Sequence, residues 1–350
     1  MIMGMALDFI NGYAGMYVVQ CLAHSLIAAI VADSCIVAWD VKTPWRKQLV
    51  RMNVLVLPLL MYPAFEFINP GRSSFFSRPW SLLDANRWLQ MDLWEKLPVI
   101  IPVAIVLGLT SIVFLLQEFL PVLRHTVESI SAGHEGAGGS RSGEQEQDDP
   151  TEEPDKYDIA LETALDGISG PRPESYIIED DDLVIFSSTG RKPAIYVSTG
   201  FIDAFDADEL RAALAHEAGH IRRSRHPVLI ALFVLRVVMF FNPVALLEFR
   251  KIVQEEERIC DEIAVELTGG DTRPLASALA RLMVHHSDDA DQDGAGIGNA
   301  LESIENYSHD MQMRNRIKRL LERRAGPDSA GWLHYAAAVV TTVAICYFVV

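Results

Sequence analysis

The chain has 350 residues, of which 50% are hydrophobic, and a formal net charge of −17. An excess of negative charge on this scale gives no support to nucleic-acid binding, which depends on basic surfaces. The four cysteines are dispersed and form no disulfide framework. The apolar residues are gathered in long blocks, which is typical of a membrane protein.

Four apolar blocks approach the length of about 20 residues that a helix needs to cross a bilayer. They are Met16–Trp39, Val50–Ile68, Leu97–Leu120 and Trp332–Val350. We therefore predict three transmembrane helices within residues 1–122 and a C-terminal transmembrane helix at 332–350, so that the lipid bilayer is a partner of the chain.

The loop after the first block is basic, with one acidic residue, Asp40, against Lys42, Arg46, Lys47 and Arg51. Because basic loops stay on the cytoplasmic side, this loop is expected in the cytoplasm, as is the stretch from Arg124 to about residue 331. Ionisable side chains also lie inside the expected spans, and for these we favour a position near an interface or pairing between helices over a functional role. They are His24, Asp33 and Glu66.

Residues 123–172 are predicted to be a flexible acidic linker and domain entry, because acidic residues cluster from Glu144 to Asp158. A soluble domain follows at 173–326. Its first part contains three β-rich stretches, at 176–178, 183–186 and 194–197. They predict a small antiparallel sheet whose edge could pair with an extended substrate.

A metal-binding pattern, His216-Glu217-Ala218-Gly219-His220, lies in a predicted helix at about 206–224 that begins with a capping box at Asp206 and Glu209. Residues four apart share one face of a helix, so both imidazoles can reach one metal ion. Glu217 projects about 100° from His216, where it can face a metal-bound water.

A second predicted helix, at about 244–268, offers a third ligand. Glu257 and Asp261 share a face, which suits one ligand carboxylate and one carboxylate that orients a bound histidine. Two alternatives stay open at this stage. The acidic run can be a solvated stripe, as we expect for Glu255 and Glu256, and Cys260 can be a soft metal ligand.

The apolar stretch 227–249 is long enough to suggest another span. A single crossing would separate His220 from Glu257, which must meet at one metal ion. We therefore predict a membrane-associated hairpin of two antiparallel helices that turns at Asn242-Pro243. Arg236 within the run argues the same way, because a charge at mid-bilayer is costly.

The combination of His216-Glu-x-x-His220, Phe241-Asn242-Pro243 and Glu257-x-x-Cys260-Asp261 resembles the BlaR/MecR-type antirepressor membrane metallopeptidases. The related HtpX and CAAX prenyl proteases usually carry Ala in place of Cys260 and have more residues between the motifs. One departure from the resemblance is the basic run 222–226, where family members commonly carry an acidic residue.

The resemblance implies a mostly α polytopic membrane protein with an α+β zincin-like (gluzincin) cytoplasmic metalloprotease domain, in a bacterial inner membrane. It implies one Zn²⁺ per chain, Glu257 as the third zinc ligand after His216 and His220, and Glu217 as the catalytic base. His309 and Arg316 are candidates for transition-state stabilisation, although a solvated basic helix at 314–324 is an equal alternative.

Three functions compete. The first is a zinc endopeptidase facing the cytoplasm that cleaves a regulatory protein, such as a cytoplasmic repressor, or itself in transmembrane signalling. The second is an HtpX-like quality-control protease. The third is a non-catalytic membrane transducer with a structural metal. Cys260 and the short motif spacing favour the first, and Glu217 argues against the third, since a structural site needs no general base.

Overall fold

The computed structural model describes residues 12–70, 88, 91–93, 97–116, 155–188, 192–224, 227–290, 310–322 and 331–350. The chain forms two compact units. The first comprises Met1–Asp148, Ile230–Val253 and Asp328–Val350, and the second comprises Asp149–Leu229 and Gln254–Pro327.

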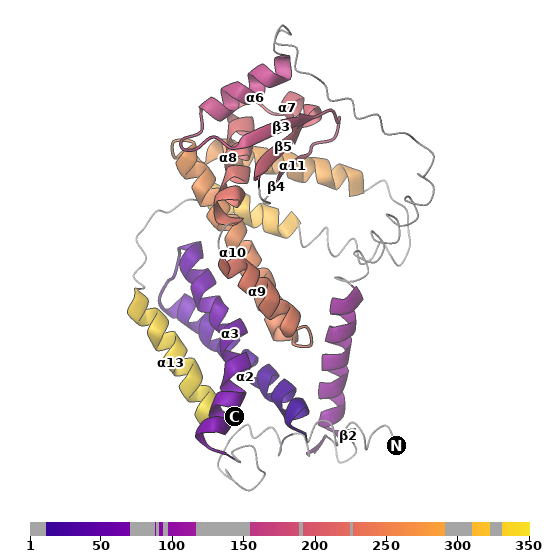
Figure 1. Cartoon of the computed structure of the whole chain (residues 1–350), viewed down its shortest axis with the longest axis vertical. Coiled ribbons are helices and arrows are strands. Elements are labelled where there is room, and N and C mark those ends of the chain that lie inside the picture. The colour runs from indigo at the N-terminus through magenta and orange to yellow at the C-terminus, as the bar shows by residue number, and fades with distance from the viewer. Residues whose placement is uncertain are drawn as a thin grey trace, which may run out of the picture. The chain divides into compact units, whose positions relative to one another are not determined.

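Three long apolar helices lie side by side in the first unit, in indigo, violet and yellow in Figure 1. They are α2 (Tyr13–Ala38), α3 (Pro44–Ile68) and α13 (Trp332–Val349), each long and apolar enough to cross a membrane. The block predicted at 97–120 is a shorter apolar helix, Ile100–Leu116, in the described residues. Two-residue strands, β1 (Asp92–Leu93) and β2 (Leu97–Pro98), pair just before it. The prediction of a mostly helical membrane protein is therefore confirmed.

A tight connection joins α2 to α3. The N–H of Val41 donates to Ile36 O at 3.0 Å, and the N–H of Asp40 donates to Val37 O at 3.2 Å. This is the Schellman pattern, which requires a left-handed residue after the helix. Asp40 supplies it with φ of 46°, and aspartate tolerates this conformation better than most residues do. Pro44 then opens α3, where its missing N–H costs nothing.

A helical hairpin enters the first unit. Helix α9 (Pro227–Val238) leads through a turn to α10 (Pro243–Leu267). Asn242 is fully buried at this turn; its Oδ1 caps α10 by accepting from the N–H of Val244 at 3.1 Å. Its Nδ2 donates to Ser25 Oγ at 2.8 Å, halfway along α2. The charge of Arg236 lies 4.7 Å from the centre of the Phe249 ring, a cation–π contact that reduces the cost of its apolar surroundings.

Four charged side chains join α2, α3 and α10. Arg51 Nη1 lies 2.9 Å from Asp33 Oδ1 and 2.8 Å from Glu248 Oε2. Lys251 Nζ lies 3.2 Å from Asp33 Oδ2 and 2.5 Å from Glu248 Oε1. The Glu248 side chain is only 2% exposed, so its charge depends on these two cations. Asp33 is thus paired between helices, as predicted.

The second unit contains a three-stranded sheet of order β3-β5-β4, formed by β3 (Glu174–Ile178), β4 (Ile185–Ser188) and β5 (Ala194–Ser198). β5 runs antiparallel to β4 but parallel to β3, so the prediction of a purely antiparallel sheet is wrong. The most buried strand, β5, takes the centre, because there both of its faces and both of its edges are covered.

Helices α6 (Lys156–Asp166), α7 (Thr199–Ala204), α8 (Ala207–Ser224) and α11 (Arg273–Ala290) complete the second unit. Its core joins the sheet to α7 and α8 through Val197, Phe201 and Leu214. Leu161 and Leu165 of α6 are buried in this core, so this helix belongs to the folded domain rather than to a flexible part of the predicted linker and domain entry at 123–172. Residues 123–154 lie outside the described part of the chain.

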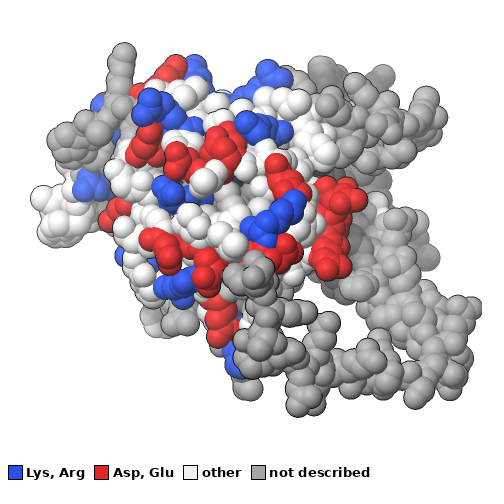
Figure 2. All heavy atoms as spheres, turned by 90° about the horizontal axis from the view of Figure 1, so that it is seen from above, with Lys and Arg blue, Asp and Glu red and all other residues white. Residues whose placement is uncertain are grey.

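The net negative charge is not concentrated on the face shown in Figure 2, where acidic and basic side chains lie among one another. The second unit also carries ion pairs at its surface. They join Lys156 to Asp203, Arg172 to Glu162, and Arg211 to Asp208. Such exposed pairs contribute little to stability.

Glu248→Leu tests the charged network in the first unit. The change leaves Asp33 as the one carboxylate of the network beside Arg51 and Lys251. Removing one partner of a buried pair lowers the free energy of unfolding by about 3 kcal/mol or more. Thermal unfolding of the purified chain in neutral detergent should therefore begin at a clearly lower temperature. Lys42→Ala is the control, because its pair with Asp40 is exposed on both sides, at 52% and 76%. Equal midpoints for the two variants would contradict a stabilising role for Glu248.

Candidate metal centre

The helix that carries the two histidines, α8, begins with the predicted capping box. Asp206 Oδ1 accepts from the N–H of Glu209 at 2.9 Å, and Glu209 Oε2 accepts from the N–H of Asp206 at 3.2 Å. Leu210 and Leu214 follow at a spacing of four and are buried in the core. This burial fixes the rotation of α8, so that His216 and His220 project together from another face.

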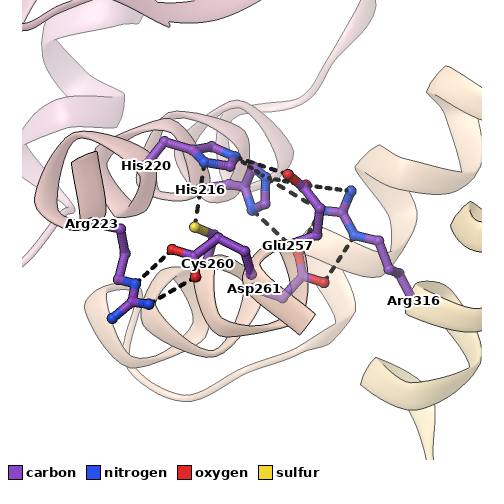
Figure 3. A network of polar contacts seen from close by, with 8 residues as sticks. His216, His220, Arg223, Glu257, Cys260, Asp261 and Arg316 are labelled. Atoms are coloured by element: carbon purple, nitrogen blue, oxygen red, sulfur yellow. Dashed lines mark hydrogen bonds and ion pairs between the residues drawn. The ribbon is translucent and has the colours of Figure 1, made fainter. Parts of the chain in front are cut away.

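Three donor side chains converge between α8 and α10 (Figure 3). The Nε2 atoms of His216 and His220 lie 3.2 Å apart. Glu257 places Oε2 at 3.6 Å from Nε2 of His216 and Oε1 at 3.7 Å from Nε2 of His220. Ligands at about 2.0–2.1 Å from one tetrahedral metal ion lie roughly 3.3 Å apart, so this donor set fits a single ion. It is the one such group of three found in the described residues.

Asp261, one turn after Glu257, lies behind His216. Its Oδ1 is 3.2 Å from Nδ1 of His216, although the pair does not have the alignment of a strict hydrogen bond. Its side chain is only 5% exposed. A carboxylate on the far nitrogen of a ligating imidazole leaves Nε2 free for the metal ion. The structure therefore places Asp261 where the sequence suggests an orienting carboxylate.

Arg316, on the helix at 310–321, holds both carboxylates. Its Nη2 lies 2.6 Å from Asp261 Oδ1, and its Nε lies 3.0 Å from Asp261 Oδ2. Its Nη1 lies 3.1 Å from Oε2 of Glu257. The side chain is 13% exposed, so the alternative of a solvated residue is wrong for Arg316. The other candidate of that segment, His309, lies outside the described residues.

These contacts change the proton affinities of the group. Burial alone lowers the pKa of His216, but its contacts with Asp261 and Glu257 outweigh burial and raise the pKa to about 9. Burial raises the pKa of Glu257, but His216 and Arg316 bring it down to about 2. The pKa of His220 is lowered, because burial and the charge of His216 outweigh the nearby carboxylates of Glu257 and Glu217, which raise it. Glu217 itself is half-buried beside the pair of histidines.

The two helices approach closely at Gly219. A Cβ atom at this position would lie 3.3 Å from the carbonyl oxygen of Cys260, tighter than an ordinary contact. Cys260 is fully buried, and its Sγ lies 3.5 Å from Nδ1 of His220. Burial raises the pKa of this thiol far above its usual value, which disfavours the thiolate form that a metal ligand needs. Cys260 is thus a packing partner of His220.

The acidic residues before Glu257 are buried. Glu255 is 4% exposed and Glu256 is 7% exposed, so the prediction that they form a solvated stripe is wrong. Arg223 Nε and Nη2 bind the two carboxylate oxygens of Glu256, each at 2.7 Å. Arg258 Nη1 donates to Glu255 Oε1 at 2.6 Å. A signal for the first pair existed in the sequence, because a basic run follows His220 and an acidic run precedes Glu257.

Comparisons with known proteins found similarity to two groups of peptidases. Residues 187–292 match the family model described as BlaR1 peptidase M56. A stretch of 55 residues is 46% identical to a protein named "Protease HtpX homolog" from Acidiphilium cryptum, and covers 15% of this chain and 19% of that protein. The chain thus spans about a fifth of the length of that relative. No solved structure matches the chain.

The family match contains the whole of both helices that supply the donor atoms, α8 and α10. Arg316 lies outside the matched residues. The resemblance to BlaR1-type peptidases is therefore confirmed for residues 187–292, and the 55-residue match supports the relationship to HtpX.

Proposed function

We propose that this protein is a membrane-integral zinc endopeptidase that holds one zinc ion per chain. The observation that carries the proposal is the convergence of His216, His220 and Glu257, with Glu217 next to the first of them on the same helix. Two imidazoles and one carboxylate are a donor set of catalytic zinc sites, which keep a fourth position open. A structural zinc site usually fills all four positions with protein ligands, so the donor set speaks against a transducer without activity.

Each side chain has a distinct task in peptide hydrolysis. When bound, zinc polarises the scissile carbonyl and makes water acidic enough to be deprotonated near neutral pH. Glu217 takes the proton from the attacking water and delivers it to the leaving amine. Asp261 keeps the imidazole of His216 oriented. Strand β4 is an edge of the sheet and contacts α8, so its free backbone edge suits pairing with an extended substrate.

The chain topology supports a cytoplasmic site. The start of α13 lies beside the loop between α2 and α3, because Trp332 and Trp39 line one cavity. Helix α3 crosses the membrane away from the side on which α13 begins. The chain must therefore cross the membrane again between residues 68 and 332. Ile100–Leu116 is apolar and has 17 residues, enough to cross with a modest mismatch. The segment with the metal site then lies on the side of the basic loop, which is the cytoplasmic side of a bacterial inner membrane.

The substrate we propose is a cytoplasmic regulatory protein, such as a repressor, or the chain itself. The similarity to a protein named as an HtpX homologue favours a second candidate, the quality control of membrane proteins. The two candidates differ in selectivity. A signalling protease cleaves one or a few sites, whereas a quality-control protease cleaves many unfolded chains.

Glu217→Gln tests the proposed activity. Removal of the general base should lower the rate of casein cleavage by about 10²–10⁴-fold, while zinc stays at one per chain. The measurement is metal analysis together with cleavage by the purified full chain. Glu162→Gln is the matched control, since this exposed carboxylate on α6 pairs only with Arg172 in the described residues. If Glu217→Gln kept full activity, Glu217 would not be the general base.

Metal uptake should release protons at neutral pH. The pKa of His216 is raised to about 9, so below that pH the metal-free imidazole carries a proton that the ion must displace. The apparent zinc affinity should therefore rise about tenfold per pH unit from pH 7 to 8 and level off above the pKa. Calorimetry in buffers of different ionisation enthalpy measures the protons released. No proton release at pH 7 would show that His216 is already neutral.

We further propose that Arg316 is a positioning residue, since its guanidinium is occupied by Asp261 and Glu257. Arg316→Met should weaken zinc binding about 10–100-fold, with little change in the turnover of fully loaded protein. Arg319→Met on the same helix is the control, because its partner Glu262 lies at the surface. Unchanged zinc affinity with a lower turnover would instead support transition-state stabilisation by Arg316.

A further inference from the structure

A separate cavity of about 180 Å³ lies in the first unit, where three candidate membrane helices begin or end. It is formed at the C-terminal end of α2 and the N-terminal ends of α3 and α13. The residues of its lining that carry the argument are Trp39, Trp45, Arg46, Trp332, His334 and Tyr335. None of them takes part in the metal centre.

Aromatic rings make up much of the wall. The Trp39 ring packs edge-on against the His334 ring, with centroids 5.0 Å apart. Trp332 is 77% exposed and Trp45 is 38% exposed, although both are large apolar residues. Exposed tryptophans at the ends of membrane helices are typical of the level of the lipid headgroups. The cavity is therefore at the depth where a headgroup lies.

The polar groups of the cavity are donors. Nδ1 of His334 accepts from the N–H of Gly331 at 3.0 Å, which leaves Nε2 as the ring nitrogen that carries a proton and can donate. Arg46 brings a permanent positive charge into the lining. Helices α3 and α13 both begin here without an acidic residue in the first turn, so the positive ends of both helix dipoles are not neutralised locally.

No acidic residue lines this cavity in the described part of the chain. The acidic residue adjacent in sequence, Asp40, has its carboxylate 2.8 Å from Lys42 Nζ and is thereby neutralised. An anion is therefore favoured over a cation, although aromatic walls alone would also suit a quaternary ammonium group.

We propose that this cavity binds the headgroup of an anionic phospholipid, with its phosphate at Arg46, His334 and the start of α13. Basic pockets between membrane helices on the cytoplasmic side suit such headgroups. A lipid fits better than a soluble phosphate, because exposed apolar side chains continue from the cavity along α13. Leu333 is 63% exposed and Val340 is 66% exposed, and both can contact acyl chains.

The test is native mass spectrometry of the full-length chain in neutral detergent, titrated with phosphatidylglycerol and with phosphatidylcholine. Phosphatidylglycerol should bind at least about fivefold more tightly. Arg46→Gln should remove most of this preference. Lys47→Gln is the matched control, because it removes the same charge from the same helical turn but lies outside the cavity lining. It should keep the preference.

His334→Phe provides a second variant, since the ring is kept and the donor is lost; it should also weaken phosphatidylglycerol binding. Glycerol phosphate is added as a competitor that lacks acyl chains, and it should not displace the lipid at equal concentration. Equal binding of the two lipids, or equal losses in Arg46→Gln and Lys47→Gln, would overturn the proposal. Displacement by glycerol phosphate would instead identify a site for soluble phosphate and overturn the lipid as its ligand.

Discussion

The close approach of α8 and α10 is the constraint on which the metal centre depends. His216 and His220 come from one helix and Glu257 from the other, and their donor atoms lie 3.2 to 3.7 Å apart. Gly219 permits this distance, because a Cβ there would crowd the backbone at Cys260.

Charge balance explains why so many ionisable groups can be buried at this contact. In the metal-free site, the carboxylates of Glu257 and Asp261 are matched by Arg316 and by protonated His216. A divalent ion that displaces the proton leaves one positive charge in excess, which the carboxylate of Glu217 can balance. In the proposed mechanism, this carboxylate is the group that accepts the proton of the attacking water.

Local patterns in the sequence predicted the site better than the fold. The helix at 207–224, its capping box and the ligand helix were all readable, because each depends on spacing within one segment. The parallel pairing of β3 with β5 was not predicted. It follows from the central place of β5 in the sheet, and which strand takes the centre depends on how deeply the core buries each strand. The burial of Glu255 and Glu256 was not predicted either, because an acidic run does not show whether arginines will pair with it in a core. Their burial depends on Arg223 and Arg258, and only the pairing of Glu256 with Arg223 spans two helices.

Helix α10 contributes a carboxylate to each of the two units. Its first half carries Glu248, which pairs with Arg51 and Lys251, and its second half carries Glu257. The first carboxylate fixes the rotation of this half of α10 against α2 and α3, because Asp33 and Arg51 of the same network belong to those helices. Apolar residues could replace the whole network at no loss of stability. They would specify the rotation less strictly, because apolar contacts have no direction. We infer that the network is retained for the rotational setting that it specifies.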